Sequence, residues 1–233
     1  MVSGQGHVLV PRNAVPAVWA SGTPMTTLLL RHGETPLSPE HRFAGRGDIP
    51  LTGNGLAQAQ AAAARLAARG DVTAVVTSPL RRARLTAEAV AEATGAPLTV
   101  DVTWAEADFG EWEGLSLSEA AKRWPDEMAA WRKDTAAAPP GGESVETVAD
   151  RVLAGLGPLT SAHAGQTVVV VSHVTPIKIL LMHALAAPLA AVRRLWLDVA
   201  ALCEVAWYPD GTGMIHSMND TSHLHALPAG AVT

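Results

Sequence analysis

The chain has 233 residues, of which 48% are hydrophobic and 17% charged, and its formal net charge is -5. This size suffices for one domain with a sizeable core, and the negative charge argues against a nucleic-acid or anionic-membrane partner. Cys203, the one cysteine, excludes an intramolecular disulfide. We expect a cytoplasmic protein, because no run reaches the about 18 to 20 apolar residues of a membrane helix and the first residues lack the pattern of a signal peptide.

Residues 1–24 are rich in proline, glycine and serine, which predicts a linker before a folded domain at 25–226 and a flexible tail at 227–233. Strands are predicted at 26–30, 73–77, 98–102, 167–171, 201–207 and 214–218. Helices are predicted at 53–69, 81–94, 116–131, 144–163 and 175–185, with a short one at 187–193. Strands that alternate with helices in this way predict a layered α/β fold.

The motif RHGET at residues 31–35 follows three leucines at the end of the first predicted strand. Ligands of α/β proteins bind at the carboxyl ends of buried parallel strands, so His32 is placed where a nucleophile is useful. Gly33 allows a sharp turn or a close backbone approach directly after it.

Four further segments carry groups that a histidine attacking phosphorus would need. Residues 78–83 (SPLRRA) present arginines after a strand, and residues 168–173 (VVVVSH) end a strand in a second histidine. Residues 104–114 (WAEADFGEWEG) place carboxylates around a glycine turn. Residues 139–144 (PPGGES) form a turn that leads into a helix.

With these motifs in this order, the chain resembles the histidine phosphatase superfamily, the phosphoglycerate mutase-like clan, in its smaller phosphatase branch. The matching segments are 31–35, 45–52, 78–87, 109–114, 140–144 and 171–173. The segments 20–24 and 171–178 further resemble the acid phosphatase domain of actinobacterial proteins that carry a ribonuclease H domain before it, although no ribonuclease H domain is present here. The resemblance implies a three-layer α/β/α fold with a mostly parallel central sheet.

The implied reaction is hydrolysis of a phosphomonoester, whose charge near neutral pH is close to two negative units. Arg31 and Arg82 are expected to hold the phosphate oxygens, because the planar guanidinium gives paired, charge-assisted hydrogen bonds. His32 is expected to attack in its neutral form through one ring nitrogen while a backbone carbonyl nearby fixes the other. The product of that step is a phosphohistidine, which water then hydrolyses. Arg81 and Arg84 are expected on a solvated helix face.

The resemblance also assigns a catalytic role to His173, which donates a hydrogen bond to a nonbridging oxygen, and to Glu106, the acid that protonates the leaving oxygen. Because this acid must be protonated when substrate binds, we expect a mildly acidic or near-neutral optimum. The other carboxylates of the segment are expected to be structural: Asp108, Glu111 and Glu113.

The loop 35–52 is expected to cover the pocket, with Arg42, Gly45 and Arg46 near the distal part of the substrate and Thr52 as the N-cap of the next helix. The sequence departs from the family at two substrate-binding positions. Ser38 stands where an asparagine commonly contacts phosphate, and serine is shorter. Val174 stands where glycine usually offers its backbone N–H to phosphate.

Two other functions are kept open by these residues: phosphoryl transfer of the phosphoglycerate mutase type, and phospho-ligand binding without catalysis. The phosphatase is favoured, because the predicted helix 116–131 offers only Lys122 and Arg123 as basic residues and because all four groups of the reaction are present. No cofactor and no metal are expected, since the late histidines match no zinc spacing and are expected to be residues of a flexible tail: His216, His223 and His225.

The expected substrate is a small organic phosphomonoester. Four tryptophans were considered either for lining its entrance or for packing the helical cap: Trp104, Trp112, Trp124 and Trp131. Neither a nucleic acid nor a membrane is expected as a partner, and a homodimer is a family-level expectation.

Overall fold

A computed structural model describes residues 21–225 and 227. One six-stranded sheet has the strand order β3-β2-β4-β1-β5-β6. The strands are β1 (Met25–Arg31), β2 (Val72–Thr77), β3 (Leu98–Val100), β4 (Thr167–Ser172), β5 (Leu202–Trp207) and β6 (Gly213–Asp220). The first four run parallel to one another, and β5 and β6 are antiparallel to their neighbours, so the predicted mostly parallel sheet is confirmed.

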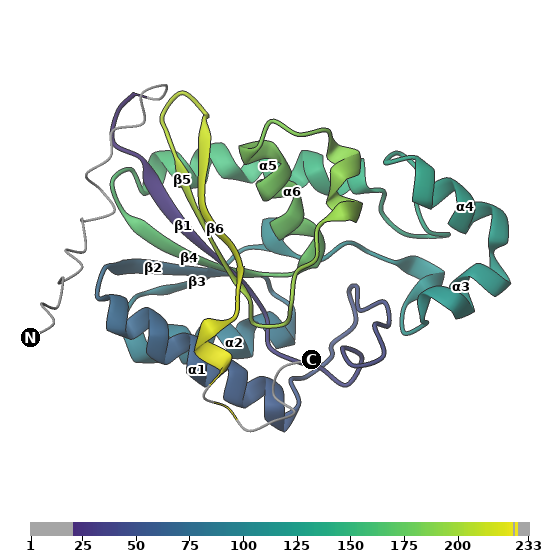
Figure 1. The fold of residues 1–233 in the computed structure, drawn as a ribbon, viewed down its shortest axis with the longest axis horizontal. Coiled ribbons are helices and arrows are strands. Elements are labelled where there is room, and N and C mark those ends of the chain that lie inside the picture. Colours follow the sequence, from purple (N-terminus) through teal and green to yellow (C-terminus); the bar gives the residue numbers. More distant parts are fainter. Residues whose placement is uncertain (1–20, 226, 228–233) are drawn as a thin grey trace, which may run out of the picture.

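Helices cover both faces of this sheet (Figure 1). The helices α1 (Gly53–Arg69) and α2 (Arg81–Thr94) pack on one face, and α5 (Val145–Ala162) and α6 (Val174–Ala184) pack on the other. Because β1 and β4 are enclosed between these layers, their side chains are apolar on both faces, as is typical of central parallel strands. The predicted three-layer α/β/α arrangement is therefore confirmed.

The prediction of one continuous helix at 116–131 is wrong. It is broken into α3 (Leu117–Arg123) and α4 (Pro125–Lys133), because Pro125 has no backbone N–H and disfavours helical dihedrals at Trp124, whose φ is -133°. Both helices lie to one side of the sheet (Figure 1). They form a small separate core around Trp112, Ala120 and Met128.

Two further boundaries differ from the prediction. The strand expected at 98–102 ends at Val100, and a 3-10 turn follows at η2 (Val102–Trp104), where the Asp101 side chain accepts a hydrogen bond from the Thr103 N–H. The short helix expected at 187–193 is a 3-10 helix, η4 (Leu189–Arg194). The η3 (Gly110–Trp112) and η5 (Ser222–Leu224) turns complete the elements of the described chain.

The predicted linker and tail lie largely outside the described residues, which begin at residue 21 and end with residue 227. The strand β1 begins at Met25, the predicted start of the folded domain. No helix in the described part of the chain is long and apolar enough to cross a bilayer.

Candidate active site

The carboxyl ends of β1 and β4 bring the two predicted histidines together. Arg31 pairs in register with Ser172, so that His32 and His173 follow neighbouring strands at the same edge of the sheet. Their ring centroids are 5.0 Å apart, and both side chains are buried. Ser78 follows the next strand, β2, and its hydroxyl lies 2.7 Å from His173 Nε2.

The ring of His32 is fixed as the sequence predicts. Its Nδ1 lies 2.7 Å from the carbonyl oxygen of Gly33, so Nδ1 carries the proton and Nε2 keeps a lone pair. The close turn depends on Gly33, because a Cβ there would stand 2.3 Å from the carbonyl oxygen of Gly55. That oxygen belongs to the first turn of α1, whose N-cap is Thr52 as predicted.

Burial keeps both histidines neutral. The pKa of His32 lies well below its ordinary value, because burial disfavours the charged ring and the guanidinium groups of Arg82 and Arg31 repel it. Burial and Arg82 lower the pKa of His173 in the same way. A neutral imidazole is the form that can act as a nucleophile.

Arg82 is fully buried next to His32, whereas its neighbours Arg81 and Arg84 are exposed, as predicted. Its Nε donates to His32 Nε2 over 3.3 Å. The rest of its guanidinium binds the 35–52 loop through three carbonyl oxygens: Ala44, Gly45 and Gly47. Arg82 thus joins the histidine to the covering loop.

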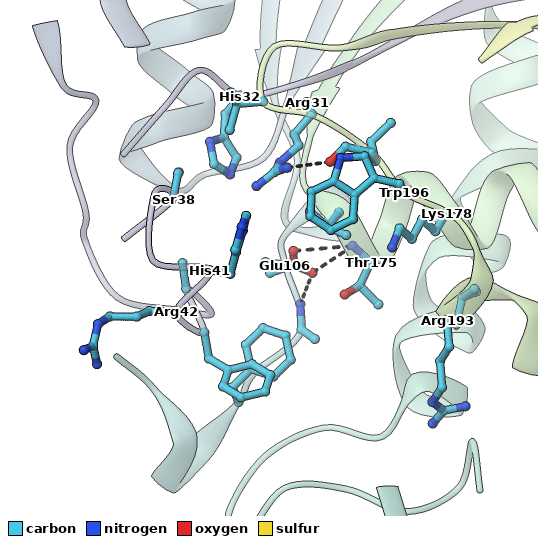
Figure 2. Close-up of a pocket in the computed structure, with 18 of the residues that line it drawn as sticks. Arg31, His32, Ser38, His41, Arg42, Glu106, Thr175, Lys178, Arg193 and Trp196 are labelled. Atoms are coloured by element: carbon cyan, nitrogen blue, oxygen red, sulfur yellow. Dashed lines mark hydrogen bonds between the residues drawn. The ribbon is translucent and has the colours of Figure 1, made fainter. Parts of the chain in front are cut away.

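A cavity of about 300 Å³ opens in front of His32 (Figure 2). Five other predicted site residues line it: Arg31, Ser38, Arg42, Glu106 and Val174. Arg82 and His173 do not line this cavity, but both contact His32: Arg82 donates to its Nε2, and the ring of His173 lies beside its ring. Gly45 is also buried away from it, and its N–H donates to the Glu113 carboxylate at 2.9 and 3.0 Å.

Arg31 faces the cavity with one side of its guanidinium engaged. Its Nη1 donates to the carbonyl oxygen of Leu197 at 2.6 Å, while its buried Nε has no partner. Burial lowers the pKa of Arg31 to about 10, so the side chain remains a cation near neutral pH. This orientation leaves donors available for an anion.

Glu106 belongs to the segment between η2 and η3, and its side chain is buried beside the first turn of α6. One carboxylate oxygen accepts the N–H of Ala107 at 2.8 Å, and the N–H of Thr175 approaches both oxygens at 3.2 and 3.4 Å (Figure 2). These main-chain donors fix the direction in which the carboxyl group faces the cavity.

Two residues of the covering loop are held by protein partners. The Ser38 hydroxyl lies 3.0 Å from both the N–H and the hydroxyl of Thr35. The guanidinium of Arg42 binds Glu119 and Glu40, and in Figure 2 it points away from the centre of the cavity. Arg46 also has a protein partner, Glu143.

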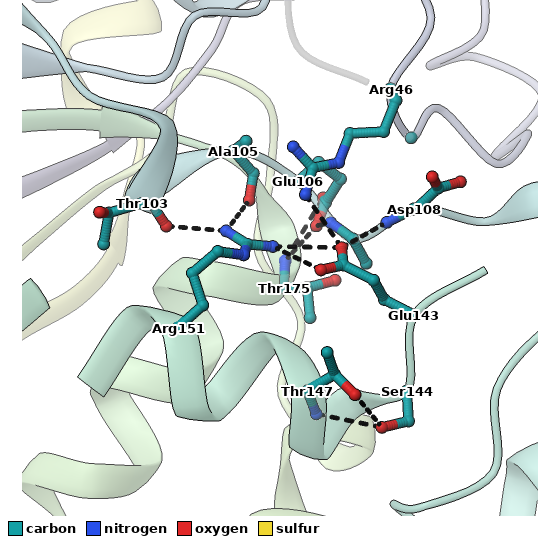
Figure 3. A network of polar contacts seen from close by, with 12 residues as sticks. Arg46, Thr103, Ala105, Glu106, Asp108, Glu143, Ser144, Thr147, Arg151 and Thr175 are labelled. Carbon is teal, nitrogen blue, oxygen red and sulfur yellow. Dashed lines mark hydrogen bonds and ion pairs between the residues drawn. The ribbon is translucent and has the colours of Figure 1, made fainter. Parts of the chain in front are cut away.

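Sequence reasoning missed the role of Glu143, which lines the cavity and joins three segments of the chain (Figure 3). Its carboxylate accepts the N–H of Asp108 at 2.9 Å and pairs with Arg46 at 3.0 Å and Arg151 at 3.2 Å. Arg151 in turn donates to the carbonyl oxygens of Thr103 and Ala105. The turn predicted at 139–144 indicated the start of a helix, but the sequence does not show which residues the Glu143 carboxylate contacts.

The neighbouring carboxylates are structural, in agreement with the prediction for Asp108 and Glu113. Asp108 accepts the N–H of Gly110 at 2.9 Å, and Glu113 holds the N–H groups of Gly45 and Gly47. Glu111 is exposed.

Of the four tryptophans considered for the entrance, Trp131 lines the cavity. Trp104 and Trp112 are fully buried core residues. Trp124 packs against the small core formed with α3 and α4, two helices that together we call the cap. The other aromatic wall residues are Phe43, Phe109 and Trp196, and the ring of His41 stands edge-on to Trp196 at 5.5 Å. Trp196 was missed because it follows an irregular segment with no periodicity.

The late histidines lie in structured segments rather than in a tail. His216 is exposed on β6, and His223 packs in η5 beside Arg65. Within residues 21–225 and 227, no three histidine, cysteine or acidic side chains are grouped so that they could hold a metal ion.

Residues 27–221 match the model of the histidine phosphatase superfamily, branch 1. The chain is 47% identical over 205 residues to "Bifunctional protein Rv2228c" of Mycobacterium tuberculosis, covering 88% of this chain and 56% of that protein, so it spans about half the length of that relative. It is 33% identical to "Probable phosphoglycerate mutase GpmB" of Salmonella newport, over 85% of this chain and 94% of that one.

Among solved structures, the fold is similar to mycobacterial glucosyl-3-phosphoglycerate phosphatase in complex with VO3. The TM-score is 0.76 at 30% identity, over 83% of this chain and 98% of that chain. The family match covers the motifs that carry His32, Arg82, Glu106 and His173. The chain therefore belongs to the histidine phosphatase superfamily, branch 1.

Proposed function

We propose that this protein is a metal-independent phosphomonoesterase that hydrolyses a small organic phosphate through a phosphohistidine on His32. The observation that carries the proposal is the hydrogen bond of 2.7 Å between Nδ1 and the Gly33 carbonyl, which leaves Nε2 as the nucleophilic atom of a buried, neutral ring. The names of the related phosphatases support the same class of reaction.

The phosphate binds between Arg31 and the neutral ring of His173. Arg31 lines the cavity with a guanidinium whose Nη1 is engaged by Leu197, and the buried Nδ1 of His173 has no partner beside the ring of His32. Arg82 donates to Nε2 of His32 over only 3.3 Å, a long and weak hydrogen bond that phosphorus displaces at little cost as it approaches this nitrogen. The Arg82 charge then remains beside the phosphoryl oxygens.

In the first step the lone pair of Nε2 forms the N–P bond while the P–O bond to the leaving group breaks. Glu106 supplies a proton to the leaving oxygen, which departs as an alcohol. In the second step water attacks phosphorus, the Glu106 carboxylate accepts its proton, and the N–P bond breaks to release inorganic phosphate. The proton is thereby returned to Glu106, and the electrons balance without a metal or a redox group.

Hydrolysis is favoured over mutase-type transfer by the position of the basic residues on the cap. Lys122 and Arg123 are exposed and do not line the cavity. A mutase must retain its phosphoryl group against water and return it to the same skeleton, and the cap offers the cavity no additional cluster of cations for that task.

The test is a panel of small phosphomonoesters assayed for released phosphate with and without a chelator. We expect phosphate release that a chelator does not reduce, that His32→Ala abolishes and that the exposed control His216→Ala leaves intact. A His32→Ala variant as active as the parent would overturn the proposal. Loss of activity that zinc or magnesium restores would contradict metal independence, and isomerised product without phosphate release would indicate the mutase.

A further inference from the structure

Lys178 lines the cavity from α6, on the side away from His32 and Ser38 (Figure 2). It is half-buried and lies four positions after Val174 at the helix start, so both side chains share one face of α6. A lysine in a helix is ordinarily solvated, so the sequence alone assigns no role to Lys178.

Its ammonium group differs from the other cations of the cavity. Arg31 donates to the Leu197 carbonyl, Arg42 pairs with Glu119, and Arg193 donates to the carbonyl oxygens of Trp131 and Asp134. Among the cavity-lining residues that the structure describes, Lys178 is the one permanent cation without a hydrogen bond or ion pair.

The electrostatic surroundings of Lys178 destabilise its charged form. Burial and the charge of Arg31 lower the pKa of Lys178, and only the carboxyl group of Glu106 acts in the opposite direction. Arg31 and Arg82 are the two cations that the proposed reaction assigns to a bound phosphate dianion, and Lys178 is not needed for that task. Its charge is therefore available to a second anionic group.

Four aromatic side chains line the same cavity as Lys178: Phe43, Phe109, Trp131 and Trp196. The guanidinium of Arg193 lies 5.4 Å from the centre of the Trp131 ring and ties that wall to η4. Such walls lower the local dielectric, so an ion pair formed between them is stronger than one in water. The volume of about 300 Å³ admits the leaving group of a small phosphomonoester.

We propose that Lys178 is a specificity-determining residue that binds a second anionic group, a carboxylate carried by an apolar or ring-bearing leaving group. This inference rests on the proposed phosphomonoesterase function and adds the substrate class. The phosphate lies at His32, the body of the leaving group lies between the aromatic walls, and the carboxylate lies at the Lys178 ammonium.

The test compares carboxyphenyl phosphates, with the carboxylate at each ring position, with the matching neutral carbamoylphenyl phosphates. The measured quantity is the ratio of kcat/KM between the two members of each pair. We expect a ratio of about 10 to 100 for the best ring position, the value of one charge-assisted hydrogen bond. Lys178→Met should reduce this ratio to about 1, Lys178→Arg should restore most of it, and Lys178→Glu should reverse the preference toward aminomethylphenyl phosphates.

Lys122→Met is the matched control, since it removes the same charge from an exposed position outside the cavity. It should keep the parent ratio. A parent ratio near 1 at every ring position would overturn the inference, and so would a Lys178→Met variant that lowers both members of a pair equally, because Lys178 would then act on the phosphate or on Glu106. Absence of His32-dependent hydrolysis of phenyl phosphate would instead sink the proposed function itself.

Discussion

His32 combines two features that a nucleophilic histidine requires, a fixed tautomer and a neutral ring. The Gly33 carbonyl fixes the tautomer, and burial between two guanidinium groups keeps the ring uncharged. The same burial would allow a histidine nucleophile to work at the mildly acidic or near-neutral pH expected from the sequence. The ring does not lose its lone pair to a proton when the solution becomes mildly acidic.

This neutrality is measurable by NMR of the free enzyme with labelled histidine. Because the pKa of His32 is depressed well below 6.5, its ring signals should not shift between pH 8 and about 5.5. His32→Ala assigns the signals by removing them. A titration of His32 with a midpoint near 6.5 would contradict the neutral nucleophile.

At the scale of single residues, the sequence predicted the groups fixed by local chemistry. Gly33 and the carbonyl contact of His32 follow from a strand end and a turn, and the buried Arg82 was distinguished from Arg81 by the motif. Lys178 was not predicted, because its free ammonium is recognised only when the partners of every other cation in the cavity are known.

At the scale of elements, Glu143 connects the turn before α5 with the covering loop and with the segment that carries Glu106. Three donors converge on its half-buried carboxylate, from Asp108, Arg46 and Arg151 (Figure 3). These contacts hold the main chain on both sides of Glu106, at Ala105 and Asp108, and thereby fix its position.

Glu143→Gln should therefore destabilise the protein by about 1 to 2 kcal/mol, because it removes the charge that two arginines share. The measurement is urea unfolding of the variant beside Glu127→Gln, an exposed carboxylate of α4 that should change the free energy of unfolding by less than about 0.5 kcal/mol. Equal stability of the two variants would show that the network contributes nothing measurable.

Most elements were predicted within two residues, since apolar strands alternate with helices that begin and end at clear caps. The errors occurred where local geometry opposes a continuous pattern. Pro125 divides the cap helix, and the Asp101 side chain ends β3 early by capping η2. The contacts between the cap and the covering loop join residues far apart in the sequence, such as Arg42 and Glu119, and no periodic pattern specifies them.

At the scale of the whole molecule, the active site is made by the order of strands in the sheet. The chain places β4 between β1 and β2, so that three strand ends with His32, His173 and Ser78 meet at one edge. This arrangement buries two imidazole rings side by side, which links the stability of the fold to pH.

Stability should fall as the pH falls. The folded-state pKa values of His32 and His173 lie below the unfolded value of about 6.5, so below that pH the unfolded chain binds more protons than the folded one. The free energy of unfolding should decrease by about 2 kcal/mol between pH 6.5 and 5.5 from these two groups. Denaturant unfolding at several pH values measures it, and a constant or rising stability over this interval would contradict the neutral pair.

The central claim is the covalent bond between phosphorus and Nε2 of His32. Rapid-quench mass spectrometry during turnover of a hydrolysed phosphomonoester tests it most directly. The account predicts an acid-labile adduct with the mass of one HPO3 unit on the peptide that contains His32, absent from His32→Ala. Turnover without any adduct, or an adduct on another residue, would contradict it.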